Sequence, residues 1–270
     1  MVRPPTAVDA VAEHYLETHL LGYGIDRLIE EHTRPGATVF TFTPIPEAYT
    51  SRHIRVEYQA AENKIAGAIL WSAVEETYLP TWRLRFTFPR QPVTGLRLVQ
   101  TGRGQALWTI HELRIFDAAN ELPRDPDWRL TAQPYPWGLP DAFDNSLATF
   151  WMCGEFLRPG QYVQVTFARP READSILMES SPNQTGLRLR LEGRDGAGNW
   201  RTLSPSPAIS DAARPLGLRR AAAAELKRRG IDYVMLFDGQ VGAADFRQNA
   251  ELWGATAVGD HKDARLYELR

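Results

Sequence analysis

The chain has 270 residues, 43% of them hydrophobic and 24% charged, a composition typical of a folded protein and not of a disordered one. Its net charge of −2 gives no reason to expect nucleic acid as a partner. The single cysteine, Cys153, excludes an intrachain disulfide and a cysteine-based metal site, and fits either a cytosolic chain or an exported domain without disulfides.

Membrane and export signals are absent from the sequence pattern. Residues 2–10 contain two prolines and lack the apolar core of a signal peptide. No apolar run approaches the ~20 residues of a membrane span. We therefore expect a soluble polypeptide, which could still be a fragment of a longer membrane protein.

The N-terminal part has helix–strand–helix patterning. Apolar residues recur at three- and four-residue spacing over residues 7–34 and again over 59–75, which predicts two helices. Pro35-Gly36 ends the first helix, and the β-rich run 38–42 follows. This series lacks enough strands to close a sheet by itself.

The sequence pattern changes in the middle of the chain. Residues 82–203 are short runs of alternating apolar and polar residues, separated by Pro, Gly, Asn and Asp, and this pattern predicts an antiparallel β-sandwich. The strands we expect include 82–86, 95–99, 161–167 and 175–179. The polar segment 117–127 is predicted to be a loop that joins two halves of the sandwich.

The C-terminal part supplies the strands that the N-terminal part lacks. It predicts a helix over 212–229, a buried strand over 231–237, a helix over 244–253 that Gly254 caps, and a hairpin of 256–259 with 265–269. Helices that alternate with strands imply a mainly parallel sheet.

The predicted fold is therefore α+β with two domains. Residues 1–78 and 206–270 form a small, discontinuous, Rossmann-like α/β domain. Residues 79–205 form an antiparallel β-sandwich, a jelly roll, inserted into it.

Two stretches of the middle segment carry a family resemblance. Residues 142–151, Ala-Phe-Asp-Asn-Ser-Leu-Ala-Thr-Phe-Trp, followed by Pro-Gly-Gln-Tyr-Val-Gln-Val at 159–165, resemble the opening of a discoidin domain, the coagulation-factor 5/8 C-type or galactose-binding-like fold. Residues 106–116, Ala-Leu-Trp-Thr-Ile-His-Glu-Leu-Arg-Ile-Phe, are similar to the closing strand of the same family. Because this closing strand comes first here, the resemblance implies a circularly permuted jelly roll.

The flanks carry a second resemblance. Four segments are similar to the soluble C-terminal region of bacterial multi-spanning membrane glycosyltransferases: residues 34–42, 47–52, 226–238 and 250–256. This resemblance implies an extracytoplasmic domain, tethered to a membrane-spanning region outside this chain. A cytoplasmic location stays open.

The discoidin resemblance also implies a calcium site. Where the family has one, it corresponds here to Asp144, Thr149 and Glu112. Asn145-Ser146 stands where the family often has Gly-Asp, so one carboxylate is missing from the six to eight oxygens that Ca²⁺ prefers. The alternative is that Asp144 only organises its turn and that the protein has no cofactor.

A glycan is the ligand class that the resemblance favours. Two prolines hold Tyr135 and Trp137 outside any strand, where rings can stack on the C–H face of a sugar. Arg158 and Asn183 could add polar contacts. The alternative is that Trp137 packs under its own loop; Trp108 and Trp151 we expect in the core.

Three functions stay open. The first is a non-catalytic, carbohydrate-associated module of a membrane glycosyltransferase. The second is a free-standing enzyme with its site at the domain junction, and the third is a protein-interaction module without a sugar ligand. No catalytic constellation stands out in the sequence, so we expect no glycosyl-transfer or hydrolase activity in this chain.

Overall fold

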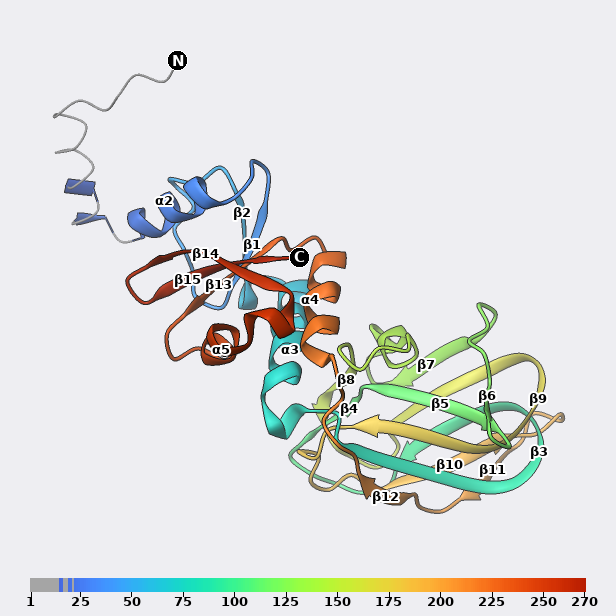
Figure 1. Ribbon diagram of the computed structural model, residues 1–270. Coiled ribbons are helices and arrows are strands. Elements are labelled where there is room, and N and C mark those ends of the chain that lie inside the picture. Colours follow the sequence, from blue (N-terminus) through green and yellow to red (C-terminus); the bar gives the residue numbers. More distant parts are fainter. Residues whose placement is uncertain (1–14, 17–18, 21) are drawn as a thin grey trace. The chain divides into compact units, whose positions relative to one another are not determined.

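A computed structural model of the protein describes residues 15–16, 19–20 and 22–270. The fold is α+β with large antiparallel sheets (Figure 1). The chain divides into two compact units, Met1–Val74 with Arg219–Arg270, called here the α/β unit, and Glu75–Leu218, called the β-rich unit. The inserted segment expected from sequence, 79–205, is shorter than the β-rich unit at both ends.

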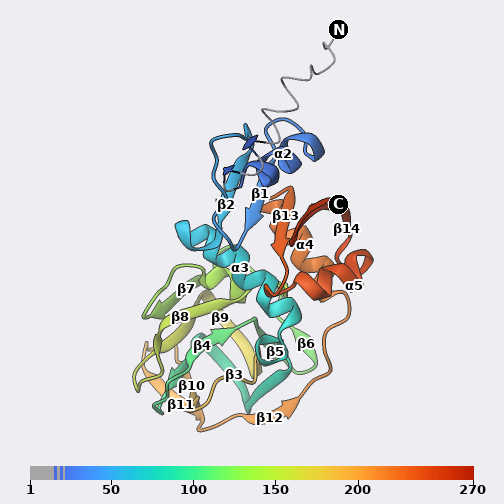
Figure 2. The same cartoon turned by 90° about the vertical axis from the view of Figure 1, so that its left-hand side faces the viewer.

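The α/β unit contains one five-stranded sheet. Its strands are β1 (Thr38–Thr41), β2 (His53–Val56), β13 (Tyr233–Phe237), β14 (Ala255–His261) and β15 (Ala264–Leu269). They lie in the order β14-β15-β13-β1-β2, and Figure 2 shows β13, β1 and β2 side by side.

The sheet is mixed, and the expectation of a mainly parallel sheet is wrong. β13, β1 and β2 run parallel, whereas β15 is antiparallel to both β13 and β14. The physical reason is that a tight turn joins β14 to β15, and a hairpin forces neighbouring strands to be antiparallel. The hairpin itself is confirmed, and β2 is a strand that the sequence pattern did not predict.

Four helices with described bounds cover this sheet: α2 (Tyr23–His32), α3 (Ala61–Val74), α4 (Leu218–Arg228) and α5 (Ala243–Trp253), with the short 3-10 helix η1 (Glu57–Gln59) after β2. Leu28 and Ile29 of α2 pack in one core with Met235 and Leu266. Phe246 of α5 lies 5.1 Å from the ring of Tyr267, which points to the other face. The sheet is therefore covered on both faces.

The helix predictions are confirmed in part: α3 and α5 match the predicted segments 59–75 and 244–253, whereas α4 begins at Leu218 and not at residue 212. Helix α2 matches the end of the segment 7–34, and most of that segment before Gly22 lies outside the described residues. Gly254 caps α5 in the left-handed conformation, with φ of 69°, and its N–H donates to the carbonyls of Ala250 and Glu251.

The β-rich unit holds ten strands and two short 3-10 helices, η2 (Glu76–Tyr78) and η3 (Leu139–Ala142). Its strands are β3 (Trp82–Gln100), β4 (Leu107–Ile110), β5 (Glu112–Asp117), β6 (Asn120–Glu121), β7 (Arg129–Gln133), β8 (Trp151–Phe156), β9 (Tyr162–Ser180), β10 (Leu189–Arg194), β11 (Trp200–Ser204) and β12 (Ala208–Asp211).

Two long strands, β3 and β9, organise the unit. They pair antiparallel with each other, and the register shifts near residues 87–95 where the chain bends. Before the bend β3 pairs with β12, and after it β3 pairs with β10. Strand β9 likewise pairs with β7 through its first half and with β5 through its second half.

Both halves of this curved sheet enclose one core. Leu84 and Phe86 lie before the bend and Leu96 and Leu98 after it, and all four belong to the same buried cluster. This arrangement is compatible with a β-sandwich. The sequence pattern predicted four separate strands because prolines interrupt each run. The structure instead has two continuous strands, since bulges absorb the prolines at the bend.

The core of the β-rich unit contains the two tryptophans predicted to lie there. Trp108 and Trp151 are fully buried with ring centroids 5.5 Å apart, which confirms them as core residues. Cys153 is buried beside them. The segment 117–127 is only partly a loop, because Asn120–Glu121 pairs back with β5 as strand β6.

Candidate functional site

An aromatic loop follows β7 at one end of the β-rich unit. In residues 133–138, Tyr135 is 42% exposed and Trp137 is 73% exposed. Their rings meet edge to face at 5.5 Å. The alternative that Trp137 packs under its own loop is therefore wrong, and both rings present faces to solvent.

The aromatic loop is tied to the core beneath it. The indole N–H of buried Trp151 donates a 2.8 Å hydrogen bond to the backbone carbonyl of Tyr135. Tyr135 has a φ of 58°, and the preceding Gln133–Pro134 peptide is cis. One core side chain thus fixes the backbone at the residue that carries the first exposed ring.

The outer face of β8 continues the aromatic surface. Met152, Gly154 and Phe156 alternate with buried Trp151 and Cys153, so they point outward. Phe156 is 59% exposed. A methyl group on Gly154 would lie 3.1 Å from the ring of Tyr135, so the tyrosine packs against this bare stretch of strand.

A cleft of about 930 Å³ adjoins β8. Its lining is Arg103, Gly104, Gln105, Leu107, Gly154, Glu155, Phe156, Leu157 and Arg158. Arg158, which the sequence predicted as a ligand contact, lies in this cleft and forms a 2.5 Å ion pair with Glu155. Gly154 belongs both to the cleft and to the contact with Tyr135, so the aromatic loop and the cleft are adjacent.

Backbone hydrogen bonds hold the two walls of the cleft together. The N–H of Gly104 donates to the carbonyl of Leu157 at 3.1 Å, and the N–H of Leu157 donates to Ala106 at 3.1 Å. Buried Gln161 donates to the carbonyl of Phe156 at 3.0 Å and accepts from the N–H of Arg158 at 3.1 Å. The residues that line the cleft are therefore set on constrained backbone.

Asn183 does not line this cleft. Its side-chain oxygen accepts a 2.8 Å hydrogen bond from the hydroxyl of Ser181, and its carbonyl accepts from Thr185. It organises a turn whose later residues pack against Gly104. The sequence predicted it as a ligand contact because asparagine in a loop fits either role.

Asp144 and Thr149 lie together and are joined by hydrogen bonds. The hydroxyl of Thr149 donates to both carboxylate oxygens of Asp144, at 3.0 and 2.8 Å, and the N–H of Ser146 donates to the same carboxylate. This is the turn-organising role that the sequence analysis left open.

Glu112 faces an arginine. It is fully buried, and its Oε1 accepts a 2.5 Å hydrogen bond from Nη2 of Arg124. Burial raises the pKa of Glu112 to about 7, against the lowering effect of Arg124, and nearby Asp144 raises it further. A guanidinium in this place repels Ca²⁺, so Glu112, Asp144 and Thr149 do not fit a calcium site. Among the described residues no group of three or more His, Cys, Asp or Glu side chains could hold a metal ion.

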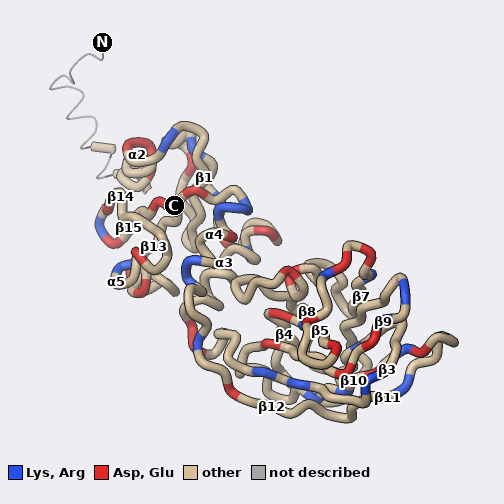
Figure 3. The backbone as a smooth tube through the Cα atoms, turned by 45° about the vertical axis from the view of Figure 1, so that its right-hand side comes forward, with Lys and Arg blue, Asp and Glu red and all other residues tan. Residues whose placement is uncertain are grey.

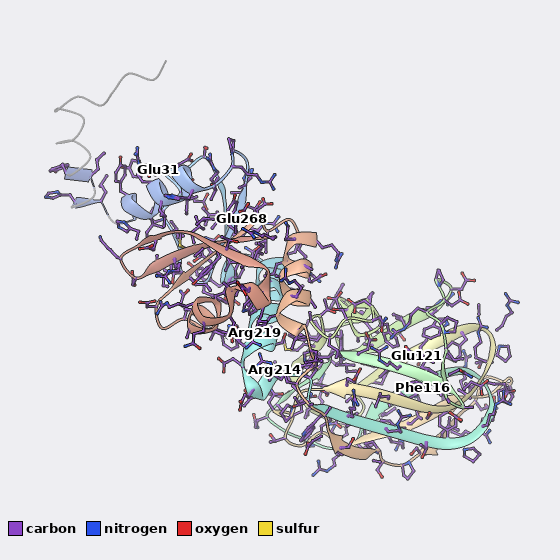
Figure 4. All side chains as sticks on the ribbon, in the orientation of Figure 1. Glu31, Phe116, Glu121, Arg214, Arg219 and Glu268 are labelled. Atoms are coloured by element: carbon purple, nitrogen blue, oxygen red, sulfur yellow. The ribbon has the colours of Figure 1, made fainter. Side chains whose placement is uncertain are left out.

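The surroundings of Glu112 form a structural charge network. Arg114 pairs with Glu121 and Glu179 on the β5–β6 hairpin and β9, and Figure 4 labels Glu121 and its strand partner Phe116. Figure 3 shows basic and acidic segments interspersed over the strands. These ion pairs link β5, β6 and β9.

Arg103, Gln105 and Phe156 line the cleft but were not predicted from the sequence. A signal for the first two was present in the Gly-Arg-Gly-Gln run at 102–105, where glycines allow a tight loop between two strands. Phe156 sits at an outward position of β8, which the alternation with Trp151 and Cys153 indicates.

None of the helices in the described part of the chain is long and apolar enough to cross a membrane. Comparisons of the chain with protein-family models, with curated proteins and with solved structures find no match.

Proposed function

We propose that the β-rich unit is a non-catalytic carbohydrate-binding module, a circularly permuted jelly roll of the discoidin type. Two things support the permutation. The motif at 106–116 resembles the family's last strand although it comes first. In the structure this segment supplies Glu112, which lies near enough to Asp144 of the family's opening loop for the two charges to interact.

We propose further that the α/β unit is Rossmann-like and that the chain belongs to the extracytoplasmic region of a membrane glycosyltransferase. The motifs in the two flanks of the chain support this. So does the sheet with its parallel β13-β1-β2 core and helices on both faces.

The exposed ring pair of Tyr135 and Trp137 is the observation that carries the sugar-binding proposal. Exposure of a large apolar ring to water is unfavourable, so an exposed tryptophan often marks a binding site. Aromatic rings of this kind bind the C–H faces of sugars well. The adjacent cleft supplies the polar side chains that orient a ligand, Arg103, Gln105 and Arg158.

The same cleft supports a binding role rather than hydrolysis. Glycoside hydrolysis generally uses two carboxylates on either side of the scissile bond. Among the described residues that line the cleft, Glu155 is the one carboxylate, and it is paired with Arg158.

Titration of the protein with oligosaccharides tests this function. We expect binding in the millimolar to high micromolar range, as befits an open site with few contacts. The substitution Trp137→Ala should weaken binding about tenfold or more, because covering the exposed apolar face of one large side chain is worth about 1.5–3 kcal/mol. Tyr58→Ala, which removes an exposed ring of the α/β unit, is the control and should leave binding unchanged.

Binding that survives Trp137→Ala unchanged would remove the aromatic loop from the proposal. Turnover of a sugar substrate would contradict the non-catalytic role.

One observation favours a second function, a protein-interaction module. Met152 and Phe156 extend the exposed apolar surface beyond the two rings, and contiguous apolar surface is also typical of protein interfaces. Absence of binding to any glycan, with capture of a defined protein partner that Phe156→Ala abolishes, would favour this function.

A further inference from the structure

Arg103 is the unpaired cation of the cleft. Many arginines of the β-rich unit face a carboxylate, among them Arg83, Arg90, Arg97, Arg114, Arg124, Arg171 and Arg190. Arg103 is exposed and makes no hydrogen bond or ion pair with any residue that the structure describes. Its guanidinium is therefore free to bind an anion from solution.

Arg158 brings a second guanidinium to the same cleft. It pairs with Glu155 at 2.5 Å, so the three charged residues of the lining carry one net positive charge. The backbone hydrogen bonds of Gly104 and Ala106 with Leu157 keep the segments that carry both arginines adjacent. A carboxylate in the cleft would meet Arg103 and could also accept from Arg158.

The apolar residues of the cleft indicate that the ligand has an apolar face in addition to an anionic group. Phe156, Leu107 and Leu157 line the cleft, and Tyr135 borders it through Gly154. A simple anion would leave these surfaces unused. A sugar ring that carries a carboxylate offers both an apolar face for the rings and an anionic group for the guanidinium.

We propose that the cleft recognises an acidic sugar, a hexuronic acid unit, with its carboxylate on Arg103 and its ring on the aromatic surface. This inference rests on the proposed sugar-binding function and names its ligand class. Gln105, exposed in the same wall, supplies amide donors and an acceptor for sugar hydroxyls.

The test compares two trisaccharides of the same linkage, one of glucuronic acid and one of glucose, by calorimetric titration of the whole chain at low salt. We expect the acidic trimer to bind about tenfold more tightly, as charge-assisted hydrogen bonds of the guanidinium group predict. The advantage should shrink at high ionic strength because the site is open to solvent.

Variants assign the preference to the cleft. Arg103→Ala should bring the acidic trimer close to the affinity of the neutral one, and Arg103→Lys should keep part of the preference, since lysine retains the charge but not the planar fork. Arg169→Ala removes an exposed arginine at the bend of β9 and is the matched control, expected to change nothing. Trp137→Ala should weaken both trimers.

The failure of this inference can be distinguished from the failure of the proposed function. Equal, Trp137-dependent binding of the two trimers would overturn the acidic preference and leave sugar binding in place. A preference that survives Arg103→Ala, or a triglutamate peptide that binds as well as the acidic trimer, would also overturn it. Absence of binding to both trimers and to other glycans would overturn the inference and the proposed function together.

Discussion

Three buried glutamines, Gln100, Gln161 and Gln184, hold the loops near the cleft. Each makes hydrogen bonds to backbone groups of nearby strands and loops. An amide side chain suits this task because it both donates and accepts. These side chains therefore help to satisfy backbone donors and acceptors that strand pairing and turns alone would leave with fewer partners.

Gln161→Ala should lower the free energy of unfolding of the β-rich unit by about 1–3 kcal/mol, because it leaves the carbonyl of Phe156 and the N–H of Arg158 without their partner. Urea unfolding followed by tryptophan fluorescence measures this. Gln105→Ala is the same substitution at an exposed position and should have almost no effect on stability. Equal stability of both variants would contradict the role given to Gln161.

His111 makes stability depend on pH. The ring is buried, with Nδ1 3.1 Å from the carbonyl of Leu147, and burial lowers its pKa from 6.5 to about 4. Between these two values the unfolded chain binds a proton that the folded chain does not. The stability contribution is therefore present above pH 6.5 and is lost as the pH falls towards 4, by on the order of 3 kcal/mol.

The comparison of wild type with His111→Asn isolates this contribution. Burial also raises the pKa of Glu112 to about 7 and of Asp26 to about 6, and these groups act in the opposite direction because acid neutralises them. Glu112 and Asp26 are present in the wild type and in the variant, so their effects largely cancel in the difference between the two free energies of unfolding. Urea unfolding between pH 7 and pH 4 should show the difference shrinking as the pH falls, and parallel curves would contradict it.

At the scale of elements, strand β8 and the loop 133–138 depend on one glycine. Gly154 has a φ of 68°, in the left-handed region, and its missing side chain leaves room for the ring of Tyr135. The inward-facing residues of β8 pack in the core, and its outward-facing residues line the proposed site. One strand therefore contributes both to stability and to the proposed binding surface.

Gly154→Ala should lower the free energy of unfolding by about 1–2 kcal/mol through backbone strain, and should also weaken sugar binding by displacing Tyr135. Gly36→Ala is the matched control, because Gly36 also has a positive φ, 73°, but no atom within 4 Å of the added methyl group. Unfolding and sugar titration of both variants should show strain in each and loss of binding in Gly154→Ala alone. Unchanged binding in that variant would separate the tyrosine from the site.

At the scale of the whole molecule, the arrangement of charges predicts no response to calcium. A ligand that binds only the folded state raises the melting temperature, and Arg124 stands against Glu112 where a cation would have to bind. Millimolar Ca²⁺ should therefore leave the melting temperature where the same concentration of Mg²⁺ leaves it. A rise specific to Ca²⁺ would show that the guanidinium moves aside.

The sequence by itself determined the types of most elements. Helical periodicity and the glycine after Trp253 located α5, and alternation located the strands of the β-rich unit, because both patterns reflect which face of an element is buried. It also located the aromatic loop, since prolines beside Tyr135 and Trp137 oppose a regular strand.

Only the tertiary structure decided how these parts meet. The bulges that make β3 and β9 continuous, the mixed sheet order and the arginine opposite Glu112 all depend on contacts between residues far apart in the chain. The cleft is the same case: Arg103 and Arg158 lie far apart in the sequence and share a cleft because backbone hydrogen bonds join their segments. Local sequence patterns show which face of an element is buried. A site, in contrast, depends on which strands and loops lie next to each other, and strand pairing is fixed only in the complete fold.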